Sequence, residues 1–267
     1  MATYSYSKLE TFRRCPYQYK LSYIDKIKTG VENIEAFVGS RFHELMEEIF
    51  SKGKEKDYFL EELLVRFRAL WKEKWHDRVR ILGTGKTPED YLSYGEQCVK
   101  NFYESYLAPG TGFSAKTLGV ELRIEFPLDP QKKNKMIGYI DRVSETADKT
   151  VEIQDYKTSI TLPEEAELSR NRQLAIYQMG LLSAWKKDGK PPLSIRLVLH
   201  YVGHSKTFSL PGRSQEELTS LLEEIRSDIS ALEREIMFPA RVSPYCKWCS
   251  YQDMCSAYQA SRKMQDA

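Results

Sequence analysis

The chain has 267 residues, of which 41% are hydrophobic, so it can bury the core of one large globular domain. Its 40 basic and 38 acidic residues leave a formal charge of +2, so any basic groove for nucleic acid must come from local clustering. The N-terminus lacks the apolar stretch of a signal peptide, and no run of residues is apolar enough to span a membrane. We therefore expect a cytoplasmic protein with no membrane partner.

The N-terminal region carries helical patterns. Residues 1–28 mix aromatic and basic side chains and predict a short helix that ends at Cys15. Over residues 36–50, apolar side chains recur every three or four positions, which is typical of a helix with one buried face. Gly39 and His43 lie one turn apart on this helix, and His43 stands at the edge of its apolar face.

Two further helices are predicted over residues 57–78 and 89–108, both rich in large aromatic side chains. We interpret residues 51–110 as a helical insertion within a single domain that spans residues 1–267. The segment Gly83-Thr-Gly-Lys-Thr between these helices ends like a phosphate-binding loop. Its leading glycine is missing, because that position holds Arg80, so we expect no nucleotide cofactor.

After these helices the pattern changes to that of strands. Three strands separated by turn residues are predicted over 118–128, 136–145 and 151–159, as in an antiparallel meander. The remaining elements are a helix over 164–187, strands over 194–202 and 206–210, and a helix over 215–236 that opens with the capping box Ser214-x-x-Glu217. The order of elements indicates an α/β fold with a mixed central sheet flanked by helices.

The second and third predicted strands carry two aspartates and a lysine. Asp155 and Lys157 lie two residues apart on one strand, so their side chains leave the same face of the sheet. If the two strands form a hairpin centred near Asp148, Asp141 lies opposite Asp155, with β-carbons about 4.5–5.5 Å apart. Two carboxylates that close repel unless a cation lies between them, and Mg²⁺ prefers such oxygen ligands. The alternative is a surface ion pair worth less than about 1 kcal/mol.

Several short motifs, spread along the chain, resemble those of a known family and follow one another in the same order. They are a Gly-x-x-x-His helix (Gly39, His43), a Gly-x-Ile-Asp strand (Gly138, Asp141), an Asp-Tyr-Lys-Thr strand (Asp155 to Thr158) and a Gln-x-x-x-Tyr helix (Gln173, Tyr177). Together with the cysteines considered below, they resemble the RecB-family branch of the PD-(D/E)XK nucleases, which includes the AddB nuclease domain and the iron-sulfur CRISPR-associated exonucleases. The resemblance implies a restriction-endonuclease-like core.

The resemblance also implies roles for individual residues. The implied metal ligands are His43, Asp141, Asp155 and the Tyr156 carbonyl, and the implied catalytic residues are Asp141, Asp155, Lys157, Gln173 and Tyr177. Glu121 on the first strand is a further candidate ligand, with Glu125 on the same face as its alternative. We expect a Mg²⁺- or Mn²⁺-dependent DNA exonuclease of repair or recombination. We expect it to act on single-stranded DNA that threads below the helical segment and stacks on aromatic residues near the N-terminus.

Three cysteines, Cys246, Cys249 and Cys255, supply soft ligands within ten residues, which is too few for a closed metal site. By its resemblance to the family's N-terminal cysteine motif, Cys15 is the fourth ligand of a 4Fe-4S cluster. Such a cluster would clasp Cys15 to the segment 240–258. Zinc is the alternative metal, and Cys98 is predicted to be a buried apolar thiol.

Two other functions remain open. One is a nuclease of the same fold that trims DNA ends for CRISPR spacer acquisition, with a CRISPR-type protein partner. The other is a catalytically inert DNA-binding subunit, although an inert site would have no reason to retain His43, Asp141, Asp155 and Lys157 together. Any associated helicase activity would belong to a partner.

Overall fold

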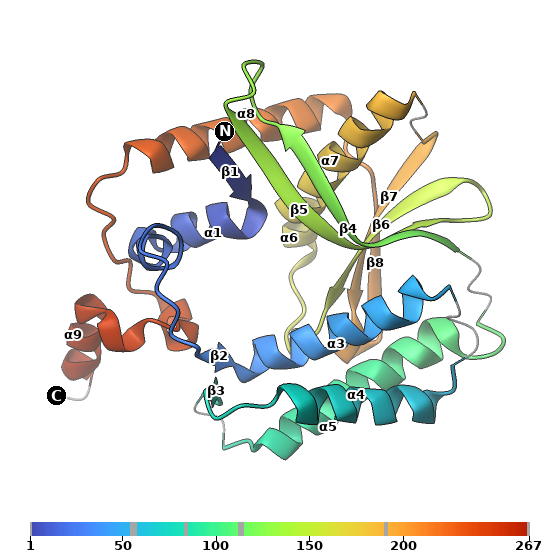
Figure 1. Cartoon of the computed structure of the whole chain (residues 1–267), viewed down its shortest axis with the longest axis horizontal. Coiled ribbons are helices and arrows are strands. Elements are labelled where there is room, and N and C mark those ends of the chain that lie inside the picture. Colours follow the sequence, from blue (N-terminus) through green and yellow to red (C-terminus); the bar gives the residue numbers. More distant parts are fainter. Residues whose placement is uncertain (1, 54–57, 83–84, 112–114, 190–191, 266–267) are drawn as a thin grey trace.

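A six-stranded mixed sheet forms the centre of the computed structural model, which describes residues 2–53, 58–82, 85–111, 115–189 and 192–265 (Figure 1). Its strands are β1 (Ala2–Ser5), β4 (Lys116–Pro127), β5 (Asn134–Glu145), β6 (Thr150–Lys157), β7 (Ser194–Tyr201) and β8 (Lys206–Pro211). A separate small sheet pairs β2 (Glu32–Asn33) with β3 (Val79–Arg80). The predicted α/β class with a mixed central sheet is confirmed.

The strand pairing follows the predicted meander and then departs from it. β4, β5 and β6 are successively antiparallel, as expected, whereas β7 runs parallel to β6 and β8 antiparallel to β7. The parallel step needs a crossover, which the helical segment between β6 and β7 provides. The sequence patterns do not predict β1, which pairs parallel with the start of β5.

One edge of β5 pairs with two different strands that diverge from each other, and we call the opening between them the fork. β4 covers the other edge over almost its whole length, while β1 pairs with residues 134–137 and β6 with residues 142–145. Within the described sheet, residues 138–141 of β5 therefore have no strand partner on the forked edge. The sheet opens between β1 and β6, and the candidate site lies at this opening.

Helices cover both faces of the sheet (Figure 1). One layer consists of α3 (Ile34–Ser51), α4 (Leu60–Lys74) and α5 (Pro88–Phe102), and the other of α1 (Tyr6–Arg14), α7 (Arg172–Asp188) and α8 (Gln215–Arg234). Each layer has its own hydrophobic core against the sheet. The shorter helical elements are α2 (Pro16–Tyr19), η1 (Lys20–Ile24), η2 (Tyr103–Leu107), α6 (Glu165–Ser169), η3 (Val202–His204), η4 (Pro244–Trp248), η5 (Gln252–Met254) and α9 (Ser256–Gln265).

Helix boundaries follow capping chemistry. The predicted capping box is confirmed, because the Ser214 side chain accepts from the Glu217 amide at the start of α8. The single helix predicted over 164–187 is wrong, since Asn171 interrupts it. The Asn171 side chain accepts from the Leu174 amide at 3.0 Å and begins α7 as a new helix. No described helix combines the length and apolar character needed to cross a bilayer.

Two glycines bring α7 close to the sheet. A β-carbon on Gly180 would lie 2.7 Å from the β-carbon of Ile124 on β4, and one on Gly138 would lie 3.0 Å from the Tyr177 ring. Both distances are at or below the limit of van der Waals contact, so larger residues would push α7 away. The two glycines thus allow the side chains of α7 to reach the fork.

Candidate active site

The two aspartates meet where β5 and β6 separate. The last bridged pair of these strands is Arg142–Gln154, so the predicted register is confirmed and places Asp141 opposite Asp155. Beyond that pair, the Tyr156 amide donates to Asp141 Oδ2 at 2.7 Å instead of to a β5 carbonyl. The Asp141 carboxylate thus takes the place of the missing ladder partner, and Asp155 is 1% exposed beside it.

A row of polar side chains joins Asp155 to α7. The Lys157 ammonium lies 2.6 Å from Asp155 Oδ2 and donates to Gln173 Oε1 at 3.0 Å. The Gln173 amide in turn donates to the Tyr177 hydroxyl at 2.8 Å. Because Gln173 and Tyr177 lie one turn apart on α7, this helix fixes the position of the lysine. The structure therefore brings these four residues together in one connected chain.

His43 reaches the same place from α3, on the opposite face of the sheet. Its Nε2 lies 3.0 Å from the Tyr156 carbonyl oxygen, and its Nδ1 lies 3.4 Å from Asp141 Oδ1. A β-carbon on Gly39 would lie 3.1 Å from the Thr158 hydroxyl, so a glycine lets α3 approach β6. Both ring nitrogens face acceptors. Burial lowers the pKa of His43, but the hydrogen bond and charge of Asp141 outweigh burial and leave the pKa above its usual value.

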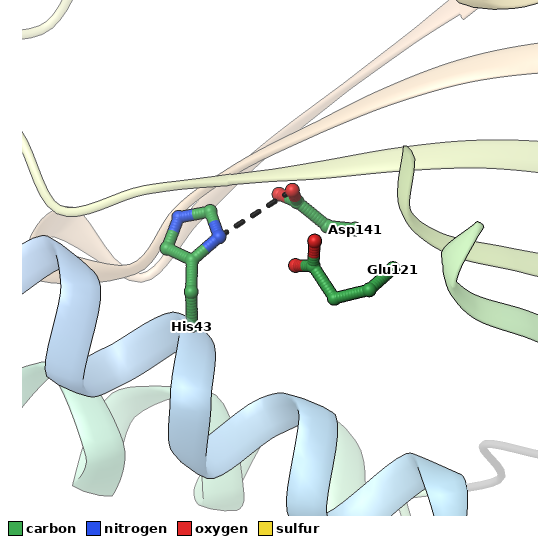
Figure 2. Close-up of side chains that lie close together, drawn as sticks. All are labelled: His43, Glu121 and Asp141. Atoms are coloured by element: carbon green, nitrogen blue, oxygen red, sulfur yellow. Dashed lines mark ion pairs between the residues drawn. The ribbon is translucent and has the colours of Figure 1, made fainter. Parts of the chain in front are cut away.

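Glu121 completes a cluster with His43 and Asp141 (Figure 2). One possible ligand atom from each of the three residues lies within 4.8 Å of the others, and the three side chains point toward one another. Glu121 lies in β4 between the pairs Val120–Arg142 and Leu122–Ile140, which puts it opposite Asp141. Its φ of 44° is left-handed, a conformation that costs a non-glycine residue about 1–3 kcal/mol and is concentrated at functional sites.

The alternative acid on this strand lies apart from the cluster. Glu125 accepts from Lys135 at 2.9 Å and also pairs with Arg123, so its charge is already neutralised at the surface. In contrast, burial and the nearby charge of Asp141 raise the pKa of Glu121. Of the two glutamates, only Glu121 shares the environment of the aspartates.

The donor set fits a hard divalent cation. Burial raises the pKa of Asp155, Lys157 opposes that shift, and the Asp141 carboxylate adds to it. Asp155 Oδ2 is buried, and the Lys157 ammonium at 2.6 Å is its partner in a charge-assisted contact. Three carboxylates, a carbonyl oxygen and an imidazole provide ligands that Mg²⁺ or Mn²⁺ accepts.

A cavity of about 630 Å³ opens over the aspartates, and aromatic rings from distant segments complete its wall. These rings are Tyr91 and Tyr94 of α5 and Trp248 of the C-terminal cysteine segment. Of the N-terminal aromatics predicted to stack on bases, Tyr4 and Phe12 are buried in the core beneath α8. Tyr6 is only partly buried, and it lies close enough to Asp155 and Lys157 for their charges to affect the pKa of its hydroxyl. No local sequence pattern identifies Trp248 as a site residue, since only the folding of the C-terminal segment places it there.

The four cysteines of the predicted clasp line one small cavity. These are Cys15, Cys246, Cys249 and Cys255. The amides of Gln18 and Arg241 point at Cys15 Sγ, each at 3.5 Å, and the Ser243 amide points at Cys246 Sγ at 3.3 Å. Amide donors of this kind favour thiolate, the form that binds metals.

The two ends of the chain are also joined by hydrogen bonds. Arg241 donates to the Arg13 carbonyl at 2.7 Å, and the Tyr17 hydroxyl donates to the Met254 carbonyl at 3.2 Å. Cys98 lies apart from this region and is fully buried among α3, α4 and α5. Burial raises the pKa of its thiol to about 12, so the prediction of a buried apolar thiol is confirmed.

The segment that resembles a phosphate-binding loop begins at Gly83 and Thr84, which lie outside the described residues. Its last residue, Thr87, is the N-cap of α5 and exchanges hydrogen bonds with Asp90. Such a capping box explains the threonine without any nucleotide.

Comparisons with known proteins agree with this arrangement. The sequence profile of the PD-(D/E)XK nuclease superfamily matches residues 3–256. No sequence among the curated proteins matches the chain. A solved structure from Eubacterium rectale, named "Putative exonuclease", is similar over 97% of this chain and 87% of its own, with a TM-score of 0.50 and 12% identity. The protein SSO0001 is similar over 96% and 86%, with a TM-score of 0.43 and 14% identity. At 12% identity, the similarity to the Eubacterium rectale structure supports the fold alone.

We expect His43→Gln to destabilise the metal-free protein more at low pH than at high pH. The folded pKa of His43 lies above 6.5, so the contribution of the protonated ring is complete below pH 6.5 and is lost as the pH rises through the folded pKa. Denaturant unfolding in EDTA, from about pH 5 to about pH 9, measures the difference from wild type. His204→Gln, at an exposed position, is the matched control. A His43→Gln difference that stays constant across this range would contradict the prediction.

Proposed function

The chain belongs to the PD-(D/E)XK nuclease superfamily, and from this premise we propose that it is a divalent-metal-dependent DNA exonuclease of repair or recombination. The observation that carries the proposal is the convergence of His43, Asp141, Asp155 and Lys157 at the fork of the sheet. Residues from a helix and two strands meet there in a cavity open to a substrate. An inert subunit would not need these four side chains together.

We assign the metal to His43, Asp141, Asp155 and the Tyr156 carbonyl oxygen, with Glu121 as a further ligand. Support comes from the cluster of His43, Glu121 and Asp141 and from the buried Asp155 carboxylate opposite Asp141. When bound, Mg²⁺ or Mn²⁺ supplies charge stabilisation to the phosphodiester and acidifies a water molecule. The five protein groups position that charge over the floor of the cavity.

Lys157 serves the chemistry as a fixed cation. Burial lowers its pKa, but the charges of Asp155 and Asp141 outweigh burial and keep the ammonium protonated. An ammonium held at this point can stabilise negative charge that develops on the phosphate. Gln173 accepts from it and thereby orients it, and Tyr177 in turn holds Gln173.

We propose a single-stranded substrate with a free end. The helical region over residues 51–110, which we interpret as an insertion, places Tyr91 and Tyr94 on the cavity wall. Their hydroxyls are already engaged, Tyr91 with Glu35 and Tyr94 with the Thr158 and Ser159 carbonyls. The rings therefore form a fixed wall beside the aspartates, and aromatic rings at such a site suit an unpaired strand, whose bases can stack on them, better than a duplex.

We further propose that the four cysteines bind a 4Fe-4S cluster with a structural role. The support is the convergence of Cys15 with the three C-terminal cysteines in one cavity and the amide donors that point at two of the sulfurs. The described hydrogen bonds between the chain ends already align these segments. A cluster would close the clasp between segments more than 200 residues apart in the sequence.

Asp155→Ala and Lys157→Ala should both abolish most nuclease activity, for different reasons. Asp155→Ala removes a metal ligand and should weaken Mn²⁺ binding, whereas Lys157→Ala should keep Mn²⁺ binding and lower kcat about 10²–10³-fold. Calorimetric Mn²⁺ titration and cleavage of end-labelled DNA, with Mg²⁺ and with Mn²⁺, separate the two effects. Lys133→Ala, at an exposed turn, is the control. Equal activity in all four proteins would end the active-site assignment.

Linear single-stranded DNA should be degraded much faster than a circle of the same sequence, because an exonuclease must capture a free end. Time courses on matched linear and circular substrates, with labels at the 5′ or the 3′ end of the linear form, measure both the requirement and the polarity. Cleavage of the circle at the same rate would show an endonuclease.

Wild-type protein purified without oxygen should be brown and contain iron and sulfide. Cys15→Ala should lose both, because it removes one of four ligands, whereas Cys98→Ala should retain both, because Cys98 lies in a separate core. Metal analysis and visible absorption spectra provide the measurement. A colourless wild-type protein that holds stoichiometric zinc would contradict the cluster assignment.

A further inference from the structure

Trp248 is shared by two neighbouring hollows. It lines the catalytic cavity of about 630 Å³, and it also lines a smaller hollow of about 210 Å³ together with Arg14, Gln18, Tyr245 and Cys249. The indole is 40% exposed and the Tyr245 ring 63% exposed. Trp248 therefore stands between the catalytic cavity and a hollow on the surface of the cysteine segment.

The backbone of Trp248 is fixed to the helix that carries His43. The side-chain amide of Asn33, the N-cap of α3, donates to the Trp248 carbonyl at 2.6 Å. On the other side, the Gln252 amide donates to the carbonyls of Cys246 and Lys247, each at 2.7 Å. These contacts hold the backbone from which the indole projects beside the catalytic cavity.

Positive charge accompanies the exposed rings. Arg14 is exposed at the end of α1, and within the part of the chain that the structure describes no carboxylate pairs with it. The Lys247 ammonium lies 5.1 Å from the centroid of the Trp248 ring. Exposed aromatic rings interleaved with basic side chains form the pattern that binds an unpaired nucleic-acid strand, because bases stack on the rings and phosphates pair with the cations.

We propose that this surface, defined by Trp248, Tyr245 and Arg14, binds the part of a single-stranded substrate that extends out of the catalytic cavity. Trp248 stacks on an unpaired base next to the nucleotide at Asp155 and Lys157, and Arg14 pairs with a phosphate farther along. The inference rests on the proposed nuclease function and specifies its substrate. A duplex does not fit this role, since its base faces are covered by stacking. The cysteine segment is then part of the substrate site, because it carries the stacking residue.

The test is the affinity for a fluorescent oligothymidylate, measured by anisotropy with Ca²⁺ in place of the catalytic metal. Loss of base stacking on one ring weakens binding about 5- to 150-fold, so Trp248→Ala should weaken binding at least about fivefold. Trp248→Phe should remain within a few-fold of wild type, because it retains a ring. Phe59→Ala, which removes an aromatic that is 69% exposed at the N-cap of α4, should bind as wild type does.

Oligonucleotides with one abasic position make the test independent of the stability of the variant. In wild type, one position along the strand should lower affinity about tenfold, and at that position Trp248→Ala should show less than about a twofold loss. Equal losses in both proteins, or wild-type affinity in Trp248→Ala, would overturn the inference even if the wild type cuts single-stranded DNA. If the wild type neither binds nor cuts such DNA, the proposed function and this inference fail together.

Discussion

The hydrogen bond from the Tyr156 amide to the Asp141 carboxylate is the contact on which the site depends. It forms where β6 leaves β5, at an edge that would otherwise expose an unpaired amide in the interior of the sheet. An unpaired buried amide costs about 1–3 kcal/mol, so the aspartate stabilises the fork while it places a carboxylate within it. One side chain therefore serves both the fold and the site.

The opening of the sheet allows the two helical layers to contribute to one site. His43 comes from α3 on one face, and Gln173 and Tyr177 come from α7 on the other. Titratable groups from these elements lie close together at the site. The pKa values of Asp155, Glu121 and His43 are all raised there. Because these shifts favour the protonated forms, protons and a metal cation compete for the same groups, so the affinity for the metal should depend on pH.

Sequence reasoning succeeds where the relevant spacing is local. A hairpin centred near Asp148 is enough to pair Asp141 with Asp155, and the same spacing logic puts Lys157 beside Asp155. The four-residue spacings of Gly39 with His43 and of Gln173 with Tyr177 place each pair on one helical face. These residues could be identified from the printed sequence because each signal lies within a few positions of its partner.

The parts that the sequence does not predict depend on distant contacts. The fork requires β1, whose four residues carry no strand pattern of their own and gain their structure by pairing with β5. The position of Trp248 likewise depends on a remote segment, since Asn33 holds its backbone, and the left-handed backbone of Glu121 has no local sequence signal. The break before α7, in contrast, has a local cause. Asn171 caps the new helix by accepting from the Leu174 amide, but the helical pattern continues across it and hides the break in the sequence.

We propose that the fork holds one divalent metal with His43 among its ligands. Electron spin echo modulation of the protein loaded with one equivalent of Mn²⁺ tests it most directly, because coupling to a directly bound imidazole nitrogen is visible without turnover. Wild type should show one bound Mn²⁺ with that coupling, and His43→Gln should lose it while His204→Gln keeps it. Mn²⁺ that shows no nitrogen coupling, or the same coupling in His43→Gln, would contradict the claim.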